Sequence, residues 1–527
     1  MAEPTEPPAR DLSRRTAIGL QWTYLGTAVG GVLQFGMAAV LARLLTPTAF
    51  GLVALAGIFL RFVDYFARAG ITQALIQKPS LSRTDIRAGF LLSAGLGATF
   101  AAVAFLAAPA AATIAREPDL VPVLQWLALG PVANGLGAPS VALLRRNLRF
   151  RPLAMLEVGS YVVGYVLVGL AMALAGRGVY ALIAAMLTQA ALKAAGAYLL
   201  IRHPVRPTFD RKAYRSILSF GARVSLISFL EFLRSNLDTL AVGRFAGASQ
   251  LGLYNRANLL ADLPAYHLSS GLAQVLFPSF SAIQFDLKRL RGAYLSAVGM
   301  TAAIIFPLNA GMAVAAREIV LVVLGPQWEG SIAVMPILLL ASSITLTSQF
   351  AGIVAEAQAA LNTKLLVAAA SAVTLAVLLL LARGGPLPGY GAALVGAAAV
   401  SHLGYVAILS RTLDTPLRNL LRPYAPAAIG AAIVAGSIAL TRVALLELLS
   451  LPTPLVLLAE VIVGAATLFV LLRIGPLKVF QADFARRLSD AGFLKETTGP
   501  VSRLLRWSIG DPAPGHGIPD GDHNERR

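Results

Sequence analysis

Cysteine is absent from this chain of 527 residues, and histidine occurs only five times. The lack of cysteine excludes disulfide bonds, thiolate metal sites and cysteine nucleophiles. The histidines are scattered without the spacing of metal ligands, so we predict no metal site. They are His203, His267, His402, His516 and His523. A Gly-x-x-x-x-Gly-Lys loop is also missing, which argues against ATP hydrolysis.

Charged residues are scarce as well. They make up 13% of the chain, against about 25% in a typical soluble domain, while hydrophobic residues make up 57%. The apolar residues are gathered in stretches of about 20, the length with which a helix crosses a hydrocarbon core ~30 Å thick. We therefore predict an all-α polytopic membrane protein with about 14 transmembrane helices. The expected spans are residues 17–42, 48–75, 88–108, 121–143, 153–174, 179–201, 216–243, 251–282, 293–315, 331–360, 363–382, 390–410, 424–441 and 454–472.

Basic residues alternate between the two sides of these spans. The N-terminal and C-terminal tails carry several Lys and Arg each, and so does every second loop with one exception. The other loops carry one each. Cytoplasmic loops are enriched in Lys and Arg, so we predict that both termini are cytoplasmic. The single cations of the outer loops are Arg43, Arg116, Arg177, Arg244, Arg317, Arg383 and Arg442. The first apolar segment is expected to be the first helix and not a cleaved leader, because it is too long for a signal-peptide core.

The formal net charge of +18 needs no nucleic acid to explain it. Most of the cations fall in the expected cytoplasmic segments, where they face the anionic lipid surface of the membrane. Membrane lipids are thus the expected partners of this basic surface.

An internal repeat divides the spans into two halves. A shift of 201 residues places Arg43 on Arg244 and Gly51 on Gly252, in spans of the same orientation. This predicts two parallel six-helix bundles, related by an axis along the membrane normal as in many transporters. We expect a cytoplasmic tail (1–16), an N-terminal bundle (17–201), a basic linker (202–215), a C-terminal bundle (216–410), two additional transmembrane helices (411–473) and a cytoplasmic tail (474–527), partly amphipathic and then disordered.

Several charges fall inside the expected spans, where they usually face a cavity or a partner. The second span carries Arg61, Asp64 and Arg68 on one helical face, at spacings of three and four residues. The seventh span carries Glu231, Arg234 and Asp238 at the same spacings with inverted signs. The two triplets either pair across a central cavity or are each satisfied within their own helix.

We predict a cationic substrate cavity and a set of coupling or ion-pair acids from these charges. The cations are Arg61, Arg68, Arg223, Arg234 and Arg256; Arg223 and Arg68 lie close enough to the cytoplasmic edge to reach it instead. The acids are Asp64, Glu157, Glu231, Asp238, Asp262 and Glu356. Each acid either binds a coupling ion, H⁺ or Na⁺, or serves as a salt-bridge partner. No other cofactor and no catalytic residue is expected.

Short motifs at the ends of the spans resemble a known family. They are Ala42-Arg43-Leu44-Leu45-Thr46-Pro47 with Phe50-Gly51; Asp238 with Gly243-Arg244, Gly247, Leu251-Gly252, Tyr254 and Ala257; Phe277-Pro278 with Ser281; and Leu324-Gly325 with Gln327-Trp328. In their order and their place relative to the spans, over about residues 11–480, they resemble the polysaccharide transporter (oligosaccharide flippase) branch of the multidrug/oligosaccharidyl-lipid/polysaccharide exporter superfamily.

This resemblance implies two six-helix bundles around a V-shaped cavity, with two extra C-terminal helices. It implies a flippase of the bacterial inner membrane that moves undecaprenyl-pyrophosphate-linked oligosaccharide to the outer leaflet by alternating access, for O-antigen, capsule or exopolysaccharide. A polysaccharide polymerase and a chain-length regulator are the partners it implies. The family has no strict binding motif to carry over, so the site residues above rest on the intramembrane charges.

Other functions remain open at this point. A multidrug or cation exporter of the same superfamily is disfavoured by the cationic excess within the spans. A peptidoglycan-precursor flippase is a second alternative. A membrane polymerase or glycosyltransferase fits less well, because the expected outer loops are short and carry no Asp-x-Asp pair; their acids are Glu117, Asp119, Glu318, Glu329 and Glu447.

Overall fold

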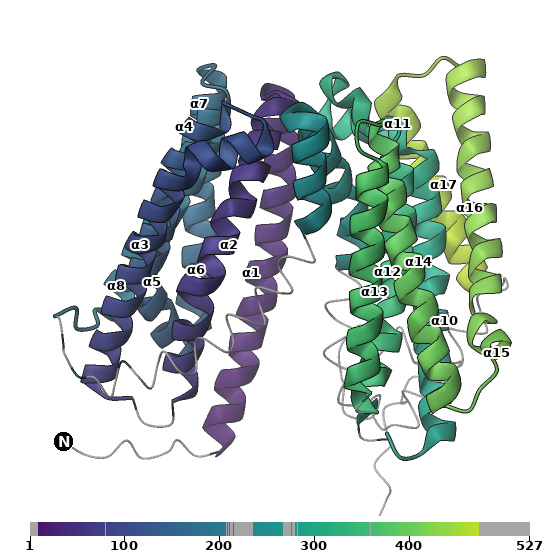
Figure 1. Cartoon of the computed structure of the whole chain (residues 1–527). Helices are drawn as coiled ribbons and strands as arrows, with labels where there is room; N and C mark the ends of the chain where they lie inside the picture. Colours follow the sequence, from purple (N-terminus) through teal and green to yellow (C-terminus); the bar gives the residue numbers. More distant parts are fainter. Residues whose placement is uncertain are drawn as a thin grey trace, which may run out of the picture. The chain divides into compact units, whose positions relative to one another are not determined.

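Helices are the regular secondary structure of the part that the computed structural model describes, which comprises residues 9–78, 81–206, 236–266, 283–358 and 360–473 with a few single residues between 208 and 281. Figure 1 shows these helices in chain order. They are α1 (Ala9–Leu44), α2 (Pro47–Gln77), α3 (Arg83–Ala115), α4 (Leu120–Leu127), α5 (Leu129–Arg146), α6 (Phe150–Tyr161), α7 (Leu170–Leu174), α8 (Val179–Ile201), α10 (Leu287–Val314), α11 (Ala316–Ile319), α12 (Met335–Ala357), α13 (Leu361–Leu381), α14 (Leu387–Thr412), α15 (Leu417–Leu421), α16 (Tyr424–Val443) and α17 (Thr453–Arg473).

Eleven of the described helices are long and apolar enough to cross a membrane. The prediction of an all-α polytopic membrane protein is therefore confirmed. Residues 216–235 and most of 267–282 belong to two expected spans and lie outside the described residues. The total of about 14 helices stays a prediction, as do the domain boundaries given above.

The chain divides into two compact units. The first comprises Met1–Ala257, Val320–Val334 and Leu375–Ala393, and the second comprises Asn258–Ile319, Met335–Thr374 and Leu394–Arg527. Each unit is described by itself below.

In the first unit, α2, α3, α5 and α8 run side by side (Figure 1). Small residues allow α3 and α5 to approach closely: a Cβ at Gly135 would lie 2.3 Å from the Ser93 carbonyl oxygen, and one at Gly97 would lie 2.6 Å from that of Pro131. Such small-residue crossings are typical of membrane helices, where van der Waals packing drives association.

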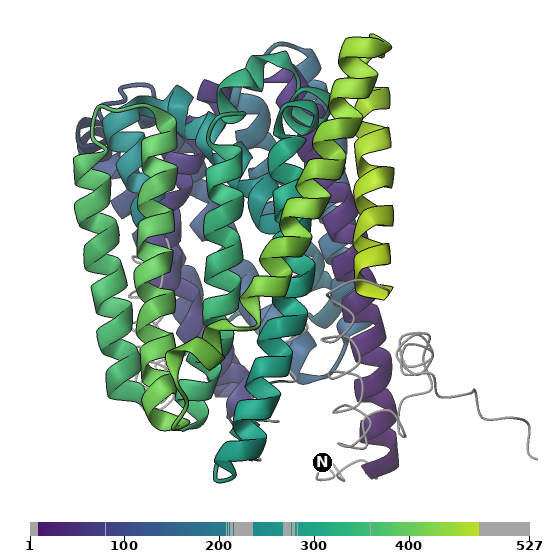
Figure 2. The same ribbon diagram turned by 90° about the vertical axis from the view of Figure 1, so that its right-hand side faces the viewer.

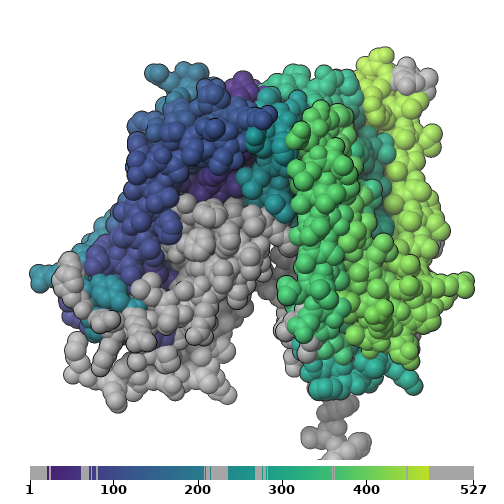
Figure 3. Space-filling model, in the orientation of Figure 1, coloured from purple at the N-terminus to yellow at the C-terminus, as the bar shows by residue number. Residues whose placement is uncertain are grey.

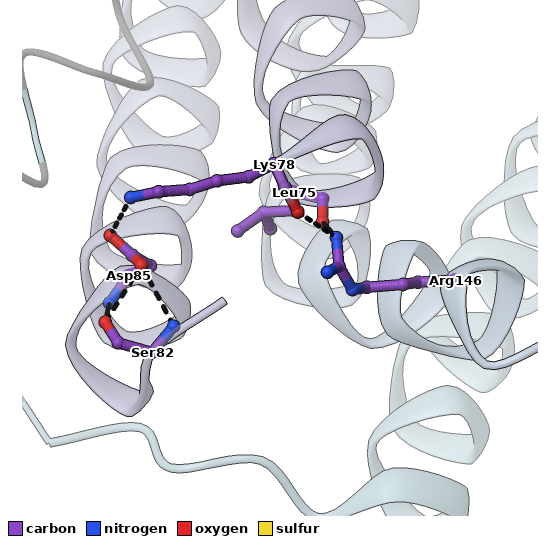
Figure 4. A network of polar contacts seen from close by, with 5 residues as sticks. All are labelled: Leu75, Lys78, Ser82, Asp85 and Arg146. Carbon is purple, nitrogen blue, oxygen red and sulfur yellow. Dashed lines mark hydrogen bonds and ion pairs between the residues drawn. The ribbon is translucent and has the colours of Figure 1, made fainter. Parts of the chain in front are cut away.

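Polar contacts tie the lower ends of α2, α3 and α5 together (Figure 4). Ser82 and Asp85 form a capping box at the start of α3, and Lys78 Nζ lies 2.6 Å from Asp85 Oδ1. Arg146, at the end of α5, donates from Nη1 to the carbonyl oxygens of Leu75, Ile76 and Lys78. A cation thereby satisfies carbonyls at the end of α2 that the helix leaves without partners.

In the second unit, α10 packs against α12 and α16, and α16 packs against α17. Its core is centred on the buried rings of Tyr294, Phe350 and Tyr405. Asn309 of α10 donates to the Leu339 carbonyl oxygen and to Ser343 Oγ, at 3.1 and 2.9 Å. Figures 1 and 2 show α16 and α17 side by side, and Figure 3 shows their outer surface in yellow. These two helices expose Leu440, Val461 and Phe469, as expected of helices that face lipid.

Candidate functional site

Three of the sequence motifs meet at one end of the first unit. The Ala42 carbonyl oxygen, at the end of α1, accepts hydrogen bonds from Trp328 Nε1 at 2.8 Å and Gln327 Nε2 at 2.7 Å. Arg43 Nη2 donates to the Val322 carbonyl oxygen. Trp328 is completely buried. Segments nearly 290 positions apart are thus joined through the free carbonyls of a helix end. We call this packed region the junction; it comprises residues 41–56, 238–257 and 320–331.

Two repeat-related helical segments, the start of α2 and residues 236–266, approach each other closely at the junction. A Cβ at Gly51 would lie 1.7 Å from the carbonyl oxygen of Ala248, and one at Gly252 would lie 1.9 Å from that of Pro47. The 201-residue shift places Pro47 on Ala248 and Gly51 on Gly252. The contact is therefore reciprocal. Gly51 lies against the carbonyl of Ala248, and its equivalent Gly252 lies against the carbonyl of Pro47, which is the equivalent of Ala248. No residue larger than glycine fits either position without movement of the backbone.

Phe50 is the aromatic centre of the junction. Its ring lies edge-on to that of Trp328, with centroids 5.4 Å apart, and the Arg256 guanidinium carbon lies 4.2 Å from the Phe50 centroid. A guanidinium over an aromatic face is attracted by the ring quadrupole. Arg256 Nε has no hydrogen-bond partner within the described part of the chain.

Tyrosines surround the same arginine. Tyr161 and Tyr165 stack with centroids 4.6 Å apart, and both lie close to Arg256. Tyr165 lies in a π-helical segment, Val162–Gly169, within the span that begins with α6. Such segments occur often at functional sites. Stacked aromatic rings beside a cation suit sugar rings and anionic groups.

Two carboxylates support the segment that carries Arg256. Asp238 is buried and accepts a 2.8 Å hydrogen bond from the Tyr254 hydroxyl, while Glu117 Oε1 accepts one of 2.6 Å from the Ala248 backbone N–H. Gly247, between them, has φ +88°, a left-handed value that favours glycine. Asp238 thus braces this segment internally, and Glu117 fastens it to the connection that follows α3.

The structure places only part of the predicted site. Arg256 and Asp238 lie at the junction or beside it. The side chains of Arg61, Asp64 and Arg68, and the residues Arg223, Glu231 and Arg234, lie outside the described residues. Their assignment to a cationic cavity stays a prediction.

The other predicted acids have local partners. Glu157 lies 2.8 Å from Lys193 Nζ, Glu356 pairs with Lys364, and Asp262 accepts a 3.1 Å hydrogen bond from Asn258. These contacts fit the salt-bridge alternative for Glu157 and Glu356. They do not test ion coupling. Lys193 also borders a cavity of about 170 Å³ together with Arg145 and Asn134.

Sequence reasoning missed two features. It placed Glu117 in an outer loop and gave it no role, although it fastens Ala248. It also passed over Glu460, a lone acid in the apolar run of α17 that is 1% exposed. The signal for Glu460 was present, because an acid within a span is a functional candidate by default. No cluster of three or more metal-ligating side chains is found among the described residues.

The fold is that of a membrane transporter. The structure resembles the lipid II flippase MurJ in an inward closed conformation, with a TM-score of 0.65 over 90% of this chain and 100% of that one, at 13% identity. It also resembles an inward-facing multidrug resistance MATE family transporter, with a TM-score of 0.52 over 73% and 95% of the chains, at 15% identity. At these identities the likeness shows the fold alone.

The sequence relatives indicate the family. Residues 40–333, more than half of the chain, match the model of the polysaccharide biosynthesis protein family, so the chain belongs to that family. It is 28% identical to the lipopolysaccharide biosynthesis protein WzxC of Escherichia coli, over 62% of this chain and 67% of that protein. It is also 28% identical to the succinoglycan biosynthesis transport protein ExoT of Rhizobium meliloti, over 61% and 65%. The resemblance found in the motifs is confirmed, and the chain is a transporter rather than an enzyme.

Proposed function

We propose that this protein is a flippase that moves undecaprenyl-pyrophosphate-linked oligosaccharide from the cytoplasmic to the outer leaflet of the bacterial inner membrane. The transported unit serves O-antigen, capsule or exopolysaccharide assembly, and both termini are cytoplasmic. The observation that carries the proposal is the reciprocal crossing of Gly51 and Gly252, found in a chain of the polysaccharide biosynthesis family.

The crossing suits alternating access. The charge pattern supports an outer position for the loops around Arg43, Arg244 and Arg317, and the junction then lies at the outer end of the first unit. A path that closes on one side must open there for release, and a small number of reciprocal backbone contacts can separate as one step.

The cargo explains the cationic and aromatic residues. A hydrated sugar and a pyrophosphate lose hydrogen bonds to water in hydrocarbon, at a cost of roughly 2–7 kcal/mol for each unpaired polar group. Arg256, together with Arg61, Arg68, Arg223 and Arg234, supplies positive charge for the pyrophosphate. The lipid tail stays in the bilayer. Asp64, Glu231 and Asp238 orient these cations or bind a coupling ion.

The test is a deletion strain, in which surface polysaccharide and the leaflet position of the lipid-linked oligosaccharide are both measured. The proposal predicts loss of polysaccharide with repeat units held on the cytoplasmic side, and recovery with the plasmid-borne gene. Repeat units that reach the outer leaflet but stay unpolymerised would indicate a polymerase. Unchanged polysaccharide with new sensitivity to cationic drugs would indicate an exporter.

A polymerase and a chain-length regulator are the partners that this role calls for. They act on the product that the flippase delivers, so their loss leaves repeat units accessible from outside. That outcome differs from loss of this protein and separates the roles in one assay.

A further inference from the structure

A buried carboxyl group in the second unit has no role in the proposed transport path. Glu460 lies in the middle part of α17 and is 1% exposed. Neither of its carboxyl oxygens has a hydrogen-bond partner within the described residues. A buried, unpaired carboxylate is strongly disfavoured, so this group calls for an explanation.

Close helix packing keeps water from Glu460. One turn further along α17, Gly464 lies against Ile438 of α16, and a Cβ there would be 2.9 Å from Ile438 Cδ1. A Cβ at Gly311 of α10 would lie 2.8 Å from the same Ile438 methyl group. Ile438 and Arg442 are four residues apart and share one face of α16, as Glu460 and Gly464 do on α17. Glu460 is therefore held beside Arg442.

The charged groups around Glu460 do not balance. Among the groups on the helices packed against α17, Glu318 of α11 and Arg442 of α16 are those that act on it electrostatically. Arg442 Nε pairs with Glu318 Oε1 at 3.2 Å, and Arg442 Nη1 donates to the Val314 carbonyl oxygen at 3.4 Å. One cation thus faces two carboxyl groups, and within the described residues it forms an ion pair with Glu318 alone.

Within the described part of the chain, three carboxyl oxygens at this place have no hydrogen-bond partner: both from Glu460, and Oε2 of Glu318. All belong to side chains that are 1% exposed, whereas the Arg442 side chain is 36% exposed. A single proton on Glu460 removes the uncompensated charge. It also creates one O–H donor, for which Glu318 Oε2 is an available acceptor.

We propose that Glu460 is a proton-binding site, formed with Glu318 and Arg442 where α11, α16 and α17 meet. One proton from the aqueous phase binds the Glu460 carboxylate and gives the neutral acid, and no other bond changes. The half-exposed Arg442 lies near the end of α16, which gives the site a short route to water. Any movement that hydrates Glu460 releases the proton, so proton binding and conformation are linked.

A proton fits this place better than a metal cation. Hard cations such as Ca²⁺ take 6–8 oxygen ligands. Here two carboxyl groups supply three free oxygens, and the guanidinium of Arg442 already occupies the fourth. The experiment described below separates proton binding from sodium binding.

The test is infrared spectroscopy on the full-length protein in lipid vesicles, without any cargo. Its result is therefore independent of whether the protein is a flippase. In sodium-free buffer at neutral pH, the wild-type minus Glu460→Gln difference spectrum is expected to show the carbonyl stretch of one protonated carboxyl group. That band is expected to disappear as the pH is raised. The matched control, Glu356→Gln, removes an acid already paired with Lys364 and leaves the band in place.

A second variant serves if Glu460→Gln does not fold. Glu318→Gln frees Arg442 to pair with Glu460, so the band is expected to vanish at neutral pH although Glu460 is intact. A flat difference spectrum would overturn the proposal, and so would a band that persists in Glu318→Gln. Loss of the wild-type band on addition of sodium at constant pH would overturn it in favour of a sodium site.

Discussion

Gly51 and Gly252 stand at equivalent positions of the two repeats. Each closely approaches a carbonyl oxygen that lies four residues before the other glycine. Pro47 and Ala248, which supply these oxygens, are equivalent as well. The relationship gives the repeat a physical meaning, because a two-fold contact needs the same small residue on both sides.

Replacing either glycine by alanine is expected to loosen the junction. The added methyl group overlaps a backbone oxygen, and overpacking of this kind costs typically about 1–3 kcal/mol. Because the chain has no native cysteine, a single Ala49→Cys probe reports the change. Ala49 is 5% exposed, so its reaction with a thiol reagent is expected to become several-fold faster in Gly51→Ala or Gly252→Ala.

Gly36→Ala is the matched control, since nothing lies within 4 Å of a Cβ at Gly36. Equal labelling rates in Gly51→Ala and Gly36→Ala would show that the crossing does not hold the junction closed.

Trp328→Phe is expected to destabilise the same region through a lost hydrogen bond. The phenyl ring retains most of the packing against Phe50 but cannot donate to the Ala42 carbonyl oxygen. A net hydrogen bond contributes roughly 0.5–1.5 kcal/mol, so thermal unfolding in detergent should shift downward by about 1 °C. Trp126→Phe, at a side chain that is 54% exposed, should leave the unfolding temperature unchanged.

Arg256→Gln is expected to weaken transport without lowering the amount of protein in the membrane. A hydrogen bond to a charged group contributes about 1.5–3 kcal/mol, which corresponds to roughly a ten- to hundredfold loss of affinity for an anionic cargo. Surface polysaccharide in a complemented deletion strain measures the effect. Arg177→Gln, in a loop, keeps wild-type output. Normal output from Arg256→Gln would remove this residue from the site.

His203 makes stability depend on pH. It is 5% exposed, and its ring packs against Phe90 and Tyr198. Burial lowers the pKa of the His203 imidazole below its ordinary value of 6.5. The unfolded chain then binds a proton at a pH where the folded protein does not, so the free energy of unfolding falls as the pH drops below about 6.5.

His203→Phe removes the imidazole that binds this proton, and it should make the free energy of unfolding less dependent on pH. Thermal unfolding between neutral and mildly acidic pH measures it. An unchanged slope in His203→Phe would assign the pH dependence to other groups.

The sequence was sufficient to predict the class of fold and the family. Long apolar runs can satisfy their backbone groups in a bilayer only as helices, and the motifs stand at fixed places relative to those runs. The repeat also predicted that Gly51 and Gly252 are equivalent. It could not predict that each glycine contacts the segment that carries the other, because equivalent positions in two repeats need not lie close together in space.

Contacts between distant side chains could not be predicted either. Glu157 was expected either to bind an ion or to pair, and only packing brings Lys193 of α8 to it. Glu460 has no partner within its own helix, and its setting depends on Glu318 and Arg442 of two other elements. The groups that surround a lone acid can be named only after the fold is known.

The central claim is the transfer of a lipid-linked oligosaccharide between leaflets. It is tested most directly with purified protein in vesicles that contain the lipid-linked oligosaccharide of the native strain, by measuring the fraction open to a membrane-impermeant sugar-modifying enzyme. Our account predicts that the protein makes the protected fraction accessible and that Arg256→Gln slows this. An accessible fraction equal to that of protein-free vesicles, with the protein folded, would contradict it.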